Sequence, residues 1–166
     1  MARPRLMSVT RDIPRAWIRP RQVMAEHMAR GTGDSAAFIF LMAGCFLLFV
    51  SRLPVLSRQS FLTGEDFMVQ MGGTLMALVF VLPLIIIALA FVAHFLAKLA
   101  GAPGTAEGAR VATAWSLLAA SPAMLLNGLT EGFLGAGPAL QLVGLVALGG
   151  FIWIWVNSLY AAEWAR

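Results

Sequence analysis

Four long apolar runs constrain the fold of this 166-residue chain more than any other feature. They cover residues 35–51, 68–99, 109–129 and 138–162. A hydrocarbon core about 30 Å thick requires about 20 apolar residues in a helix. The chain is also 60% hydrophobic and only 12% charged, whereas soluble domains carry about 25% charged residues. We therefore expect an integral membrane protein, an all-α bundle of four transmembrane helices.

The run over residues 68–99 is much longer than one bilayer crossing needs at about 1.5 Å per residue. It must tilt, kink at Pro83 or extend into the cytoplasm. The two halves on either side of Pro83 are each too short to cross comfortably. Four spans are therefore favoured over five.

The distribution of Lys and Arg predicts how the chain lies across the membrane. The connection between the first two runs holds only Arg52 and Arg58, and the connection between the last two holds none. The other ten positive residues are Arg3, Arg5, Arg11, Arg15, Arg19, Arg21, Arg30, Lys98, Arg110 and Arg166. Under the positive-inside rule, this excess places both termini in the cytoplasm. Both termini on one side require an even number of spans.

Residues 1–34 form a basic arm that precedes the transmembrane domain, residues 35–166. Pro14 and Pro20 each suit a first helical position, which predicts two short amphipathic helices meeting near Arg19. Ile13 and Trp17 share one face of the first helix. The second helix has an apolar face of its own, formed by Val23, Met24 and Met28.

Two roles for the arm are open. In the first, it lies among the headgroups of anionic lipids, and the contact residues are Arg11, Arg15, Trp17, Arg19 and Arg21. In the second, it docks on the ends of its own spans and its arginines act only as topology signals. We expect no nucleic-acid partner, because the chain has no basic domain and no aromatic platform.

Polar residues are few within the apolar runs. We expect His94 to lie at the interface, Asn157 to bond a neighbouring helix and Glu131 to be solvated. The sequence identifies no carboxylate partner for either histidine, and no nucleophile with a histidine beside it. It therefore predicts no enzyme, cofactor or metal site. Rows of small residues favour close helix packing, in a compact bundle or a homo-oligomer. They are Gly72, Gly73 and Ala77 in the second run, Ala112, Ser116 and Ala120 in the third, and Gly144 and Gly149 in the fourth.

A glycine-rich stretch joins the second and third runs. It lacks the lysine, the spacing and the preceding strand of a phosphate-binding loop. We expect Gly101 to end one helix, Gly104 to turn the chain and Thr105 to cap the next helix. Further on, Pro122 should kink the third span and free a carbonyl group, for which the hydroxyl of Ser121 is a candidate partner.

Aromatic residues cluster at the end of the last run. They are Trp153, Trp155, Tyr160 and Trp164. Such rings are suited to the membrane–water interface, because each combines an apolar body with a polar group that needs a wet partner.

The stretch G-x-x-G-T at residues 101–105, the helix with Trp115 and Ser116, and the pair Ser121–Pro122 resemble the most recognisable segment of the Yip1 family. The arm sequence DIPRAWIRPRQVM is similar to the lead-in of bacterial Yip1-like proteins. The family commonly has five spans, whereas we count four.

Among the proteins that the chain resembles, eukaryotic relatives act in vesicle trafficking and membrane shaping and associate with small GTPases. We expect a bacterial inner-membrane protein that organises membrane or partner proteins through its bundle and arm. The alternative is an accessory subunit of a larger membrane complex, or a small transporter component.

Overall fold

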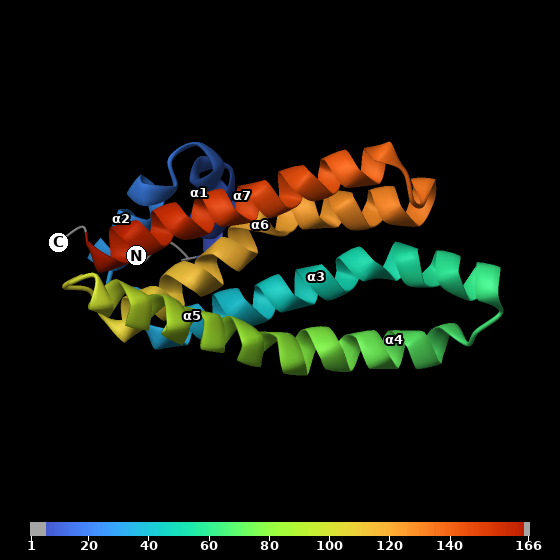
Figure 1. Ribbon diagram of the computed structural model, residues 1–166, viewed down its shortest axis with the longest axis horizontal. Coiled ribbons are helices and arrows are strands. Elements are labelled where there is room, and N and C mark those ends of the chain that lie inside the picture. Colours follow the sequence, from blue (N-terminus) through green and yellow to red (C-terminus); the bar gives the residue numbers. More distant parts are fainter. Residues whose placement is uncertain (1–5, 165–166) are drawn as a thin grey trace.

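The computed structural model describes residues 6–164, so Arg3, Arg5 and Arg166 of the charge count lie outside the described residues. The described part is helical and has no strand (Figure 1). Its elements are α1 (Leu6–Ile18), α2 (Pro20–Ala29), α3 (Asp34–Thr63), α4 (Phe67–Leu75), the π-helical segment η1 (Met76–Val81), α5 (Leu82–Leu99), α6 (Ala106–Leu134) and α7 (Pro138–Glu163).

Four helices of the described residues are long and apolar enough to cross a membrane. They are α3, the continuous rod Phe67–Leu99 formed by α4, η1 and α5, then α6 and α7. The predicted all-α membrane bundle is thereby confirmed. The arm helices α1 and α2 lie at the same end of the bundle as the last turns of α7, as an even number of spans requires (Figure 1).

Helix α6 is the centre of the bundle, packing along both α3 and α7. Its most apolar window is 67% buried although it has the lowest hydropathy of the four, 1.3. The rod has the highest hydropathy, 3.1, and is only 17% buried. Lipid-facing surfaces must be apolar, whereas helices inside a membrane protein pack through small residues. The small residues of α6, Ala112, Ser116 and Ala120, are buried as expected.

Other close approaches in the bundle differ from the expected ones. Gly72 and Gly73 of the rod are exposed and have no neighbour within 4 Å of the position a Cβ would take. The backbone of α6 instead packs on α3 at Gly128, against Ser51. A side chain at Gly128 would collide with the Ser51 backbone.

Helix α3 is longer than the apolar run that predicted it, continuing past Ser51 to Thr63. The charges that end the run face α6. Arg52 Nη1 lies 2.8 Å from Oε2 of Glu131, and Arg58 Nη1 donates to the Phe133 carbonyl at 3.2 Å. The prediction that Glu131 is solvated was therefore wrong, because its partner is distant in the sequence.

The rod is irregular directly before Pro83, where η1 replaces the α-helical pattern with wider turns. Proline has no N–H to donate to the preceding turn, and such π-helical segments are one way to absorb the defect. The expected disturbance near Pro83 thus takes the form of a π-helical segment.

The hairpin between α5 and α6 has the predicted form. Gly101 follows the end of α5 with φ +81°, in the left-handed region that favours glycine. Thr105 caps α6, its Oγ1 accepting from the Gly108 N–H at 3.2 Å, and Glu107 lies in the first turn. These residues form a helix–turn–helix connection.

Candidate functional site

The N-terminal arm folds as two helices that meet at Arg19, as predicted. Pro20 lies at the first position of α2, but Pro14 lies inside α1 rather than at its start. Thr10, whose carbonyl loses its helical partner to Pro14, is exposed together with Pro14. Water can therefore bind that carbonyl, which makes an interior proline tolerable.

The arm lies against α6 and α7 (Figure 1). The side chains of Ala16, Val23 and Met24 have no exposed surface, and they join the same core as Trp115 and Ile154 of the bundle. Of the two roles considered for the arm, the structure therefore has the docked arrangement.

Trp17 holds α1 against α6 and α7. Its indole Nε1–H donates to the carbonyl of Ala119 at 3.0 Å. Its ring lies so close to Gly150 of α7 that a Cβ there would collide with it. Ala119 is three residues before Pro122, where α6 lacks a normal backbone donor. The ring thus occupies the space that Gly150 of α7 leaves open, and its N–H bonds the backbone of α6.

The carbonyl freed by Pro122 has the partner that the sequence suggested. Ser121 Oγ donates to the Leu118 carbonyl at 2.8 Å. Ser121 is 1% exposed, so this bond satisfies a group that water does not reach.

A charged cluster joins α1 to α2. Asp12, which is 2% exposed, accepts from Arg15 at 3.0 Å and from Arg30 at 3.3 Å. The same two arginines donate to Glu26, at 2.7 and 2.9 Å. The hydrogen bond from Arg15 lowers the pKa of the Glu26 carboxyl below its ordinary value. The cluster fixes the angle between the two arm helices.

His27 connects this cluster to the bundle. Its ring centroid lies 4.5 Å from that of Trp115 and 5.6 Å from that of Phe40. Its Nε2 lies 3.9 Å from Oδ2 of Asp12. Burial lowers the pKa of His27, an effect that Asp12 opposes and Arg30 reinforces. Burial of the ring therefore favours its neutral form.

Arg21 joins α2 to the last turns of α7. Its Nε–H donates to Oδ1 of Asn157 at 2.8 Å, and its guanidinium lies 4.5 Å from the ring centroid of Tyr160. The amide of Asn157 donates in turn to the Trp153 carbonyl. The prediction that Asn157 bonds a neighbouring helix is thereby confirmed.

A second contact closes this end of the bundle. Glu163, the last residue of α7, is fully buried, with Oε1 2.7 Å from Nδ1 of His94 on α5. The Glu163 carbonyl accepts from the Gly104 N–H at 2.9 Å. The expectation that neither histidine has a carboxylate partner was wrong, since His27 faces Asp12 and His94 contacts Glu163. Each carboxylate is too far from its histidine in the sequence for local spacing to indicate the contact.

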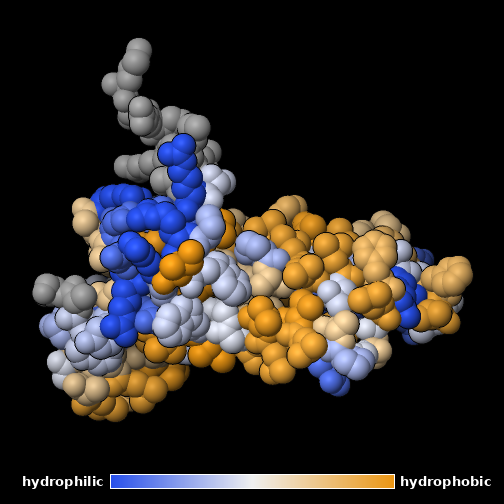
Figure 2. Space-filling model, turned by 90° about the horizontal axis from the view of Figure 1, so that it is seen from above, coloured by the Kyte–Doolittle hydropathy of each residue, from blue (hydrophilic) through white to orange (hydrophobic). Residues whose placement is uncertain are grey.

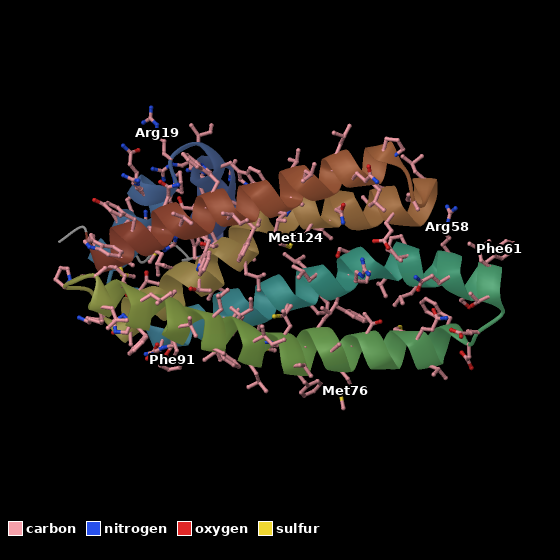
Figure 3. All side chains as sticks on the ribbon, in the orientation of Figure 1. Arg19, Arg58, Phe61, Met76, Phe91 and Met124 are labelled. Atoms are coloured by element: carbon pink, nitrogen blue, oxygen red, sulfur yellow. The ribbon has the colours of Figure 1, made fainter. Side chains whose placement is uncertain are left out.

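The predicted lipid-contact residues divide into two groups. Arg11 and Arg19 are exposed, and Arg19 points away from the protein (Figure 3). Arg15, Trp17 and Arg21 make the contacts within the chain described above. Hydrophilic side chains gather at the end of the molecule that carries the arm, and much of the remaining visible surface is apolar (Figure 2). Lipid contact by these five residues stays a prediction.

The aromatic cluster of α7 also divides. Trp153 is exposed, and the Tyr160 and Trp164 rings stack with centroids 5.6 Å apart. Trp155 faces inward, and its Nε1–H donates to Oγ1 of Thr113 at 3.1 Å. Trp155 therefore joins α7 to α6. In the part of the chain that the structure describes, no group of three His, Cys, Asp or Glu residues could hold a metal ion.

The apolar four-helix bundle with a docked N-terminal arm defines a small multi-pass membrane protein. A family model described as the Yip1 domain matches residues 15–163, which include most of the arm and all four long helices. The chain belongs to the Yip1 family. No curated protein and no solved structure matches it.

Proposed function

We propose that this protein is a non-enzymatic scaffold of the bacterial inner membrane that organises membrane or partner proteins through its bundle and basic arm. Its two termini lie in the cytoplasm. The observation that supports this most is the docked arm, in which charge pairs and buried contacts hold α1 and α2 on the bundle while Arg11 and Arg19 face outward.

One set of arm residues holds the arm on the bundle, and a different set is exposed for contact with a partner or with lipid. Trp17, Arg15 and Arg21 make contacts inside the chain, so they position the arm. The exposed residues Arg11, Ile18 and Arg19 lie on its outer surface, and Ile18 is 78% exposed. A basic surface with an apolar side chain suits anionic headgroups or an acidic protein surface.

Site-specific photo-crosslinking in native membranes tests the proposal. A photoreactive residue in place of Ile18 should capture lipid or a defined protein neighbour. The matched control replaces Gln59, which is exposed at the opposite end of α3. Replacing Arg11 and Arg19 with Gln should reduce capture at position 18 and leave capture at position 59 unchanged. If capture at position 18 were unchanged after Arg11 and Arg19 are replaced, the result would contradict the proposal.

The same experiment addresses the accessory-subunit alternative. A single protein captured in fixed stoichiometry from positions on both the arm and the apolar face of α7 would favour a subunit of a larger complex. Ion flux through proteoliposomes that is lost on replacing His94 or Asn157 would favour a transporter component.

A further inference from the structure

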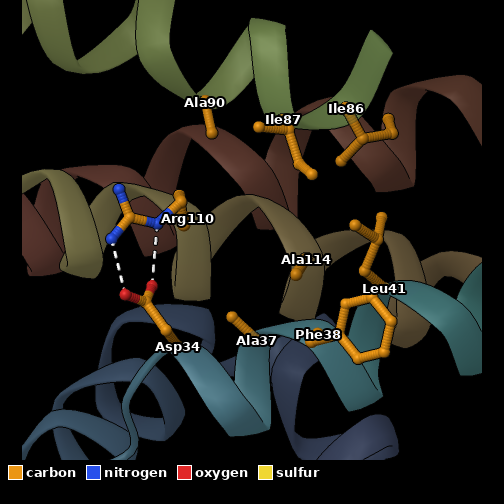
Figure 4. A pocket seen from close by; sticks show the side chains of 9 residues that line it. All are labelled: Asp34, Ala37, Phe38, Leu41, Ile86, Ile87, Ala90, Arg110 and Ala114. Atoms are coloured by element: carbon orange, nitrogen blue, oxygen red, sulfur yellow. Dashed lines mark hydrogen bonds and ion pairs between the residues drawn. The ribbon is translucent and has the colours of Figure 1, made fainter. Parts of the chain in front are cut away.

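We propose that the cleft between α3, α5 and α6 binds one glycerophospholipid with an amine headgroup. The cleft has a volume of about 190 Å³. Its walls are almost wholly apolar, with an arginine–aspartate pair at one end (Figure 4). The site lies apart from the arm contacts with α7, and the inference does not rest on the proposed function.

The walls of the cleft suit an acyl chain. Ala37, Ala90 and Ala114 leave space between the three helices, and Leu41, Ile86 and Ile87 line the rest. The ring of Phe38, which is 62% exposed, stands at the edge. A cleft that is open on one side and borders lipid-facing helices gives a chain of the surrounding bilayer direct access.

The charged end of the cleft lies at a depth that suits a headgroup. Arg110 donates from Nε and Nη2 to the two oxygens of Asp34, both at 2.7 Å. The other α3–α6 ion pair, Arg52–Glu131, lies 18 residues further along α3 and 21 further along α6. At 1.5 Å per residue the two pairs are separated by about 27–32 Å. This spacing matches the hydrocarbon core, about 30 Å.

The balance of charge at this end selects the headgroup. Two carboxylates lie at this end with one guanidinium: Asp34 pairs with Arg110, and Glu107 Oε1 accepts from the Asp34 N–H at 3.3 Å. The guanidinium of Arg110 also lies 5.6 Å from the ring centroid of Phe91. Lys98 is directed to the hairpin, donating to the Ala102 carbonyl. A phosphate next to Arg110 together with an ammonium near Asp34 and Glu107 complements this set, whereas an anionic headgroup would meet net negative charge.

Native mass spectrometry of the full chain from nanodiscs tests the site. The probes are dioleoyl phosphatidylethanolamine and dioleoyl phosphatidylglycerol, which share their acyl chains. The wild type should retain one phosphatidylethanolamine in preference to phosphatidylglycerol. Ala90→Phe fills the cleft and should lower retention about tenfold or more. Ala88→Phe is the matched control, because Ala88 is exposed on the same helix, and it should retain lipid as the wild type does.

A surface variant tests the headgroup without disturbing the core. Glu107 is exposed, and Glu107→Gln should reduce the preference for phosphatidylethanolamine about fivefold, the effect of one charge near a membrane surface. Glu65→Gln, an exposed carboxylate at the other end of the bundle, should change nothing. Equal retention of both lipids by the wild type would overturn the proposal, as would equal retention by the two Phe variants.

Discussion

The hydroxyl of Ser121 donates a 2.8 Å hydrogen bond to the carbonyl of Leu118, the group that Pro122 leaves without a backbone donor. Pro122 removes one backbone hydrogen bond of α6, and the side chain of the preceding residue, Ser121, replaces it. The next carbonyl along the helix, that of Ala119, accepts from Trp17. The carbonyl that the proline leaves without a donor is thus satisfied within α6, and the arm bonds the carbonyl of the next residue.

A double-mutant cycle tests this repair. Ser121→Ala should destabilise the protein by about 1–3 kcal/mol, because a buried carbonyl loses its partner. Pro122→Ala restores a backbone N–H, so Ser121→Ala should cost much less in that background. Equilibrium unfolding in detergent measures both differences. Equal costs in the two backgrounds would show that the hydroxyl contributes only through packing.

The indole N–H of Trp17 should contribute to docking of the arm. Trp17→Phe removes the bond to Ala119 and keeps most of the ring, so docking should weaken by about 1 kcal/mol. Amide hydrogen exchange should then accelerate about fivefold in α1 and α2 and remain constant in the rod. Uniform acceleration across all helices would indicate global destabilisation instead.

Docking of the arm should weaken on acidification. Burial lowers the pKa of His27 below 6.5, so the docked arm binds fewer protons than the released arm. Its contribution is complete above about pH 6.5 and is lost as the pH falls through the pKa of the docked state. The lowered pKa of Glu26 adds a second loss below pH 4.5, in the contact between α1 and α2 that Arg15 makes. Limited proteolysis of the arm between pH 7.5 and 4 follows both steps.

The variant His27→Gln serves as the control for this titration. It has no ring to protonate, so only the loss assigned to Glu26 should remain. If the variant kept the full response near neutral pH, another group would be responsible for it.

The Arg52–Glu131 pair should couple α3 to α6. Both side chains are partly exposed, with 43% and 27% of their side-chain surface accessible. Each of Arg52→Glu and Glu131→Arg places like charges side by side and should lower thermal stability. The double exchange should recover most of the loss, with a coupling energy of about 1 kcal/mol. Additive losses in the double variant would mean that the two residues act independently.

The predicted topology has a direct readout. Reporter fusions at Glu65 and Glu131 should be periplasmic, whereas fusions at Glu107 and at the C-terminus should be cytoplasmic. A periplasmic C-terminus with the other three unchanged would require an odd number of spans. Inversion at all four positions would overturn the positive-inside assignment.

Local signals predicted much of this molecule. The number of long helices, the Gly101 turn, the Thr105 cap, the break at Arg19 and the Ser121 repair each depend on residues within a few positions of one another. In such cases the residues that determine the local structure are neighbours in the sequence, so the sequence alone indicates the outcome.

Contacts between helices could not be predicted in the same way. Arg52 and Glu131 are 79 residues apart, and His94 and Glu163 are 69 apart. Their pairing depends on which faces of the helices meet, and hydropathy does not determine this. The least apolar of the four long helices is in fact the most buried. The docked position of Trp17 likewise depends on α6 and α7 together.

The arm's position also has a consequence for biosynthesis. Residues 6–29 leave the ribosome before their partners Ala119, Gly150, Asn157 and Tyr160 have been made. Docking is therefore a late, long-range step, which carries a high cost in chain entropy. Until α7 has been inserted, the apolar face of the arm has no place in the bundle and is free for a chaperone or the bilayer surface.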